Sequence, residues 1–138
     1  MQWDEQISIE EYRRLRRRVG WFDMEEGQAG RCLAGSWAVV CARAAGAAVG
    51  VARVIGDGGY MALIADVMVD PDWQGRGVGR GLMERALARI QDQLSPGQPV
   101  MVNLMSVPGR EGFYEQLGFV RRPNEHDGAG LALWLGRP

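Results

Sequence analysis

Residues 67–79 read VMVDPDWQGRGVG, and this stretch decides the fold. An apolar strand ends at Pro71, a glycine-rich turn follows, and apolar residues then recur at helical spacing up to about Leu94. Glycine permits the positive φ angles that such a turn needs, and it lets a ligand approach the backbone. Because the first amides of a helix lack partners and lie at the positive end of its dipole, the stretch predicts an anion site.

Two common phosphate-binding motifs do not fit these glycines. The dinucleotide fingerprint G-x-G-x-x-G fails because Arg80 stands where a third glycine would have to follow Gly75 and Gly77. The Walker motif needs a lysine, whereas all sixteen basic residues of the chain are arginine. The lack of lysine also excludes a Schiff-base enzyme. The loop instead matches the pattern Q/R-x-x-G-x-G/A from Gln74 to Gly79.

The composition excludes several other classes of protein. A chain of 138 residues with a net charge of −1 indicates one globular domain and argues against a nucleic-acid binder. A single histidine, His126, and two cysteines leave too few ligands for a standard zinc site. No apolar stretch approaches ~20 residues, and the acidic N-terminus does not resemble a signal peptide. We therefore expect a cytoplasmic protein with free thiols and without a metal, nucleic-acid or membrane partner.

The rest of the chain alternates between helical and strand patterns. Residues 8–11, SIEE, form a capping box that predicts a helix over 9–19, whose arginine run we interpret as its solvated face. Residues 20–35 are irregular, with room for a short helix. Strands are predicted over 37–43, 48–55, 60–69 and 100–105, a short helix over 110–117, and closing strands over 119–122 and 131–135. This order predicts a single α+β (mixed α/β) domain over 1–138, with a central mixed, mostly antiparallel sheet and helices on both faces.

Two motifs together resemble those of the GNAT superfamily of acyl-CoA-dependent N-acyltransferases. The first is the loop from Gln74 to Gly79, and the second is FYEQLGF at 113–119, which begins 35 residues after Val78. The resemblance covers roughly residues 37–134. It implies a GNAT-like domain with a splayed pair of parallel strands, and transfer of an acetyl group from acetyl-CoA to a primary amine by direct attack in a ternary complex.

The resemblance also implies which residues bind coenzyme A. Strand residues 67–69 would pair with the pantetheine arm, and the amides of 75–79 would hold the pyrophosphate. Arg76 and Arg80 would contact phosphates, although both also fit solvated helix arginines. Val107 stands where the family commonly has an asparagine, which removes one expected contact. The predicted cofactor-binding residues are Val67, Met68, Val69, Gln74, Gly75, Arg76, Gly77, Val78, Gly79, Arg80, Ser106 and Tyr114.

Tyr114 and Asp66 are the catalytic candidates. Tyr114 resembles the tyrosine with which the family protonates the departing thiolate, and the alternative is a core aromatic. Asp66 is a carboxylate in an apolar strand, which suits a general base; alternatively it orients a substrate or bonds the backbone. Deprotonation relayed by water needs no dedicated residue. Glu111 and His126 are weaker candidates for the base.

The acceptor is the least defined part of the prediction. A small-molecule amine fits best, held between residues 20–35 and 123–130. Asp23, Glu25 and Glu26 could attract its charge, and Trp21 and Phe22 could form apolar walls. The alternative interpretation, which the residues favour, is that they are solvated acids and a core aromatic pair. The alternatives are a protein or peptide N-acetyltransferase and a non-catalytic acyl-CoA-binding regulatory module. The edge strands and residues 131–135 also suggest a homodimer.

Overall fold

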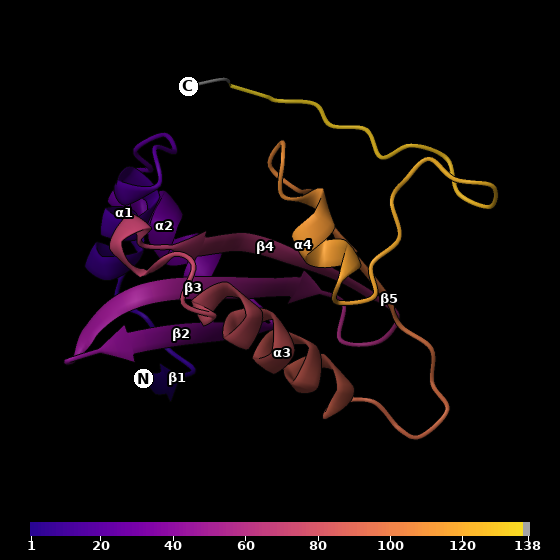
Figure 1. Ribbon diagram of the computed structural model, residues 1–138, viewed down its shortest axis with the longest axis horizontal. Coiled ribbons are helices and arrows are strands. Elements are labelled where there is room, and N and C mark those ends of the chain that lie inside the picture. The colour runs from indigo at the N-terminus through magenta and orange to yellow at the C-terminus, as the bar shows by residue number, and fades with distance from the viewer. Residues whose placement is uncertain (137–138) are drawn as a thin grey trace. The chain divides into compact units, whose positions relative to one another are not determined.

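The computed structural model describes residues 1–136 and divides into two compact units, one over Met1–Leu104 and one from Met105 onward (Figure 1). No helix among residues 1–136 is long and apolar enough to cross a membrane. The first unit contains, in chain order, β1 (Gln2–Asp4), α1 (Ile9–Arg18), α2 (Glu26–Ala34), β2 (Ala38–Ala44), β3 (Ala47–Gly56), β4 (Met61–Val69), the 3-10 turn η1 (Pro71–Trp73), α3 (Val78–Gln91) and β5 (Met101–Leu104). The second contains α4 (Glu111–Glu115).

The five strands form one mixed sheet in the order β1-β2-β3-β4-β5. The first four are antiparallel neighbours, whereas β4 and β5 run parallel. This confirms the α+β fold class and the mostly antiparallel sheet that the sequence predicts. Strand β1 was not predicted, because three residues are too few to show an alternating pattern.

Helices cover both faces of the sheet. A side chain at Gly50 of β3 would meet Val78 and Leu82 of α3 at 3.0 and 3.1 Å. The next residue, Val51, packs instead in the buried cluster with Tyr12 and Leu15 of α1. Because successive strand residues point to opposite faces, α1 and α3 lie on opposite sides of the sheet. Helix α2 contacts α1 and extends its layer (Figure 1).

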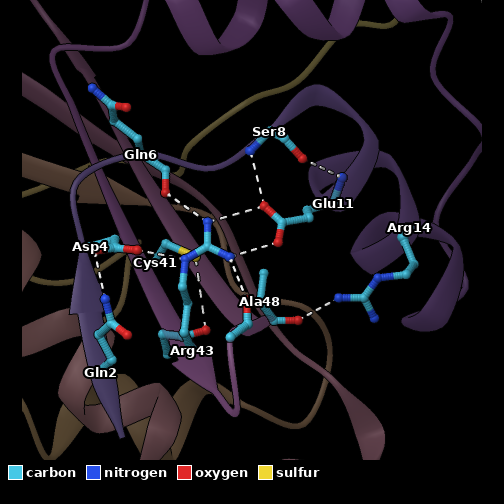
Figure 2. A network of polar contacts seen from close by, with 11 residues as sticks. Gln2, Asp4, Gln6, Ser8, Glu11, Arg14, Cys41, Arg43 and Ala48 are labelled. Atoms are coloured by element: carbon cyan, nitrogen blue, oxygen red, sulfur yellow. Dashed lines mark hydrogen bonds and ion pairs between the residues drawn. The ribbon is translucent and has the colours of Figure 1, made fainter.

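Arg43 joins β1, β2 and the start of α1 through one guanidinium group (Figure 2). It donates to both carboxylate oxygens of Glu11, at 2.6 and 3.1 Å, and to the carboxylate of Asp4. It also reaches the backbone carbonyls of Gln6 and Gly46. Glu11 is at the same time the N3 residue of the predicted capping box, which is complete, with both hydrogen bonds between Ser8 and Glu11 formed. One arginine therefore fixes where α1 begins relative to the sheet edge.

The second unit departs from the prediction after α4. Gly118 has φ +98° and its amide bonds to the carbonyl of Glu115, which confirms the predicted helix stop. The predicted closing strands over 119–122 and 131–135 are wrong for the described chain, where both segments lack strand pairing. An alternating apolar pattern gives a segment the propensity for a strand, but only a hydrogen-bonded neighbour makes it one.

Candidate functional site

The outer edge of β4 is open over its second half. Strand β5 pairs with β4 only from Met61 to Ile64, where Ile64 lies opposite Leu104, the last residue of β5. Beyond this point β4 continues from Ala65 to Val69 with a partner on the β3 side alone. The pairing of the parallel strands therefore ends halfway along β4, as the resemblance implies, and among the described residues Val67, Met68 and Val69 have no strand partner on that side.

A β-bulge interrupts β4 where this open edge begins. Asp66 and Val67 together stand opposite the single residue Ala52 of β3, between the pairs Arg53–Ala65 and Val51–Met68. Asp66 takes the left-handed conformation, with φ +54°, which is uncommon for a residue other than glycine. The bulge turns the Asp66 side chain toward the layer of α1.

The glycine loop leads from the open edge into α3. Gly75 and Gly77 have φ angles of +74° and +81°, so both need the conformational freedom of glycine. Gly77 is the N-cap of α3, where no side chain makes a capping bond. The first amide to bond within the helix is that of Gly81, to the carbonyl of Gly77. The amides of Val78, Gly79 and Arg80 are therefore available for an anion at the positive end of a 14-residue helix.

The polar side chains of the loop have partners within the chain. The guanidinium of Arg76 lies 4.9 Å from the ring centre of Trp73, and both Arg76 and Arg80 are exposed. Arg80 pairs with Glu84 at 2.9 Å, one helical turn away. Gln74 donates to the carbonyl of Val69 at 3.1 Å, which closes the loop back onto the end of β4. Arg76 and Arg80 thus remain reachable by a phosphate, while Gln74 supports the loop.

Asp70 anchors the start of the loop. It is buried, and its carboxylate accepts two hydrogen bonds from Arg18 of α1, at 2.8 and 3.1 Å, and one from the amide of Asp72. Arg14 adds an ion pair at 3.6 Å. The hydrogen bonds from Arg18 are the main reason that the pKa of Asp70 is lowered. The sequence analysis missed this anchor, because it interpreted the arginines of α1 as a solvated face.

Asp66 is part of a buried cluster of polar side chains. Its carboxylate accepts from Nε of Arg53 at 2.6 Å and from the hydroxyl of Tyr12, and it lies 3.6 Å from Nη1 of Arg16. Arg16 and Arg53 are 4% and 7% exposed. Burial is the main cause that raises the pKa of Tyr12, to about 12, with the bond to Asp66 second. In the structure Asp66 is thus the counter-ion of two buried arginines, a contact that neither the role of general base nor the orientation of a substrate predicts.

The predicted acceptor residues of the 20–35 segment also have structural partners. Trp21 and Phe22 pack around the guanidinium of Arg16, with ring centres 5.5 and 4.6 Å away. Asp23 pairs with Arg13 and Arg17, at 3.5 and 3.3 Å. Glu25 caps α2 by accepting from the amide of Gly27. These contacts fit a packed aromatic pair and solvated acids, which was the alternative interpretation of the segment.

The second unit holds the remaining candidates. Tyr114 is half-buried in α4, and its ring packs edge-on against Phe113 and Phe119, with centres 5.0 and 6.2 Å away. Burial raises the pKa of Tyr114, partly offset by the charge of Arg110. Ser106 donates to the neighbouring carbonyl of Val107 at 2.7 Å.

The structure shows no special environment around the weaker base candidates, Glu111 and His126, or around the two cysteines. Glu111 accepts from the amide of Gly109, and His126 lies in an exposed loop. Cys32 and Cys41 are free thiols, as expected. Within residues 1–136 no three His, Cys, Asp or Glu side chains gather into a group that could hold a metal ion.

Several curated proteins with related sequences are named N-acetyltransferases. Serotonin N-acetyltransferase 2, chloroplastic, of Oryza sativa subsp. japonica is 38% identical over 94 residues, which cover 67% of this chain and 44% of that protein. GCN5-related N-acetyltransferase 1, chloroplastic, of Arabidopsis thaliana is 41% identical over 76 residues, which cover 55% of this chain and 36% of that protein. The chain spans about half the length of the curated relatives it matches.

Solved structures extend the similarity to nearly the whole chain. A GNAT-family acetyltransferase from Streptococcus pneumoniae superposes with a TM-score of 0.78 at 27% identity, covering 99% of this chain and 97% of that one. A Staphylococcus aureus protein described as a probable acetyltransferase gives 0.83 at 25% identity, with coverages of 96% and 98%. The model of the acetyltransferase (GNAT) domain family matches residues 35–121. The chain thus belongs to the GNAT acetyltransferase family.

Proposed function

We propose that the protein transfers an acetyl group from acetyl-CoA to the primary amine of a small molecule, by direct attack in a ternary complex. The observation that carries the proposal is the open edge of β4 over Ala65–Val69, which is followed, after η1 and the glycine loop, by a helix with uncapped N-terminal amides. A ligand with an extended, amide-containing arm that ends in a pyrophosphate would match the strand edge first and the helix N-terminus second. Coenzyme A has this chemistry.

On this proposal the donor adds to the sheet as a short strand. The amides of the pantetheine arm would pair with backbone groups of Val67, Met68 and Val69, on the side that β5 leaves open. The pyrophosphate would accept from the amides of Val78 and Gly79 and those of the preceding loop. Arg76 and Arg80, both exposed, would add charge-assisted contacts to phosphate oxygens.

The chemistry requires a neutral amine, support for an oxyanion and a proton for the leaving group. The amine nitrogen attacks the thioester carbonyl, the tetrahedral oxyanion is stabilised by an amide of β4 near Met68, and the C–S bond breaks. The amine loses a proton to water or a base, and the thiolate takes one from Tyr114. The phenol of a tyrosine is protonated at neutral pH, since its ordinary pKa is about 10. Burial raises the pKa of Tyr114 further and makes the phenol a weaker acid, so the transfer depends on close contact with the thiolate.

The names of relatives point to two kinds of acceptor. The rice relative is named for serotonin, a small aromatic amine. A Glycine max relative that is 37% identical over 75 residues is named histone acetyltransferase TAP1. We favour the small amine, because the higher identity and the longer match both belong to the rice protein. Acetylation of a protein or peptide is the second candidate.

The test is release of free coenzyme A thiol from acetyl-CoA, with serotonin and other arylalkylamines, polyamines, amino acids and a lysine-rich peptide as acceptors. We expect release with an arylalkylamine and a rise in melting temperature with acetyl-CoA alone. Release with the peptide alone would favour the second candidate. Stabilisation by acetyl-CoA without turnover of any amine would favour a non-catalytic acyl-CoA-binding module. No stabilisation at saturating acetyl-CoA would overturn the proposal.

A further inference from the structure

The left-handed residue of β4 depends on its side chain for support. Asp66, with φ +54°, lies in the bulge, between the last regular pair of β3 and β4 before it and the first regular pair after it. The ladder does not fix its backbone, because in the bulge two residues share one partner. A residue other than glycine keeps this strained conformation only where surrounding contacts hold it. The contacts of the Asp66 carboxylate therefore decide the path of the strand here.

Both oxygens of this carboxylate have partners from other elements. Oδ2 accepts from the hydroxyl of Tyr12 in α1 and from Nε of Arg53 in β3, the latter at 2.6 Å. Oδ1 lies 3.6 Å from Nη1 of Arg16, which also belongs to α1. Arg53 is itself tied to the end of α2, because its Nη1 donates to the carbonyl of Cys32 at 2.9 Å. The bulge is thus held by α1 and β3 directly, and by α2 through Arg53.

Tyr12 is the uncharged member of this cluster. It is completely buried, and its hydroxyl, which Arg16 approaches to 3.5 Å, donates to Asp66. Burial is the main cause that raises the pKa of Tyr12, to about 12, so the hydroxyl remains a donor near neutral pH. Replacing Tyr12 by phenylalanine would remove this one hydrogen bond and keep the ring and both guanidinium groups.

We propose that Tyr12 is a positioning residue for acetyl transfer, because its hydroxyl holds Asp66 in the left-handed conformation and so fixes the direction of the peptide groups that follow. These are the groups of Val67 and Met68, which on the proposed function pair with the pantetheine arm and support the oxyanion. The inference rests on that proposed function. It adds to the site a residue 54 positions away in the sequence, which acts through Asp66 and touches neither donor nor amine.

Steady-state kinetics of Tyr12→Phe tests the role in catalysis. Support of the oxyanion is needed only in the transition state, so we expect kcat to fall about tenfold, with a smaller rise in KM for acetyl-CoA. The pH dependence of kcat should stay that of the wild type, because Tyr12 transfers no proton. Leu15→Val is the matched control, since Leu15 lies in the same helix and the same buried cluster. It should lower the melting temperature and keep wild-type kcat.

Three kinetic results would overturn the proposal. The first is wild-type kcat in a folded Tyr12→Phe variant. The second is an equal loss of kcat in Leu15→Val, which would assign the effect to stability alone. The third is a shifted pH profile of kcat in Tyr12→Phe, which would show that the hydroxyl acts on a group that transfers a proton.

Backbone NMR tests the effect on the bulge without any acetyl transfer. In Tyr12→Phe the amide resonances of residues 66–68 are expected to move more than those of residues 61–64, which lie in the half of β4 that pairs with β5. Leu15→Val should give no such localised change. Unmoved resonances at 66–68 would overturn the proposal. A wild-type protein that turns over no amine would contradict the proposed function, while this comparison would still decide whether Tyr12 holds the bulge.

Discussion

Arg18, in the last turn of α1, holds Asp70 at the end of β4 through two hydrogen bonds, Nη2 to Oδ1 at 2.8 Å and Nε to Oδ2 at 3.1 Å. The two residues are 52 positions apart in the sequence. Asp70 immediately precedes the turn that leads to the glycine loop, and the amide of Asp72 shares its carboxylate. The position of the loop thus depends on a residue of a different layer.

Arg18→Ala is expected to raise KM for acetyl-CoA about tenfold, or ~1.4 kcal/mol, with a much smaller change in kcat. The loop would lose a bidentate anchor, so its amides would no longer be arranged before the donor binds. Steady-state kinetics with varied acetyl-CoA measures both parameters. Arg17→Ala is the control, because the ion pair of Arg17 is with exposed Asp23, away from the loop anchor. Equal KM values for the two variants would show that the anchor does not serve the loop.

Gly77→Ala is expected to weaken acetyl-CoA binding. A side chain at φ +81° costs about 1–2 kcal/mol of backbone strain and adds a methyl group beside the amides of α3. Gly58→Ala has the same strain, at φ +75°, in the turn between β3 and β4 and away from the loop. Melting temperatures should fall similarly in both variants, while calorimetric affinity for acetyl-CoA should fall only for Gly77→Ala. An unchanged affinity would remove this loop from the donor site.

Tyr114→Phe is expected to lower kcat about 100-fold and leave KM for acetyl-CoA nearly unchanged, because the ring packing persists and only the proton donor is lost. Thiol release at saturating acetyl-CoA measures the effect. Tyr60→Phe, at an exposed tyrosine of the β3–β4 turn, is the matched control. Wild-type turnover in Tyr114→Phe would exclude the phenol as the acid.

Asp66→Asn tests the two roles of the buried carboxylate. It leaves Arg16 and Arg53 without their counter-ion, so we expect a loss of about 3 kcal/mol in unfolding free energy. The folded fraction should retain the pH dependence of kcat. Urea unfolding and a pH profile measured below the melting temperature test both expectations. Normal stability together with loss of the acidic limb of the profile would instead identify Asp66 as the base.

Glu11 should make stability depend on pH. Hydrogen bonds from Arg43 are the main cause that lowers its pKa from 4.5 to about 2. The unfolded chain therefore takes up this proton first, so the stabilisation is complete above pH 4.5 and is lost as the pH falls toward 2. The carboxylate is 25% exposed and its pair is screened, so Glu11→Gln should cost about 1 kcal/mol at pH 7.

Urea unfolding at several pH values between 7 and 3 measures this dependence. The difference in unfolding free energy between the wild type and Glu11→Gln should become smaller as the pH falls. Glu10→Gln, at the exposed neighbour outside the Arg43 network, should show a small and nearly constant difference. A difference for Glu11→Gln that stays constant down to pH 3 would contradict the assigned ion pair.

Features encoded by neighbouring residues could be predicted from the sequence. The capping box at Ser8 and Glu11 lies within four residues, and the structure forms it as expected. The glycine loop is equally local, since Gly75 and Gly77 each set their own backbone conformation. The separation of β4 from β5 was predicted from the family resemblance and not from a local pattern. The hydrogen-bonded pairing of the two strands, which ends at Ile64 and Leu104, agrees with that prediction.

Features that depend on distant partners could not be predicted. Arg18 and Asp70 are 52 residues apart, and Arg53 and Asp66 belong to different strands. An arginine on a helix has the same sequence pattern whether it faces water or a buried carboxylate. The prediction of closing strands was wrong for a related reason. The alternation of apolar residues in 131–135 gives a propensity for a strand but does not specify which strand it would pair with.

Helix α1 is bound at two points four residues apart, one in β4 and one immediately after it. Tyr12 and Arg16 reach Asp66, and Arg14 and Arg18 reach Asp70. Two fixed points along this stretch of chain define the rotation of the helix about its own axis. Each inserted or deleted residue would turn the following part by about 100° and separate one pair of contacts from the other. The segment between Tyr12 and Arg18 should therefore tolerate substitution at its outer positions but no change in length.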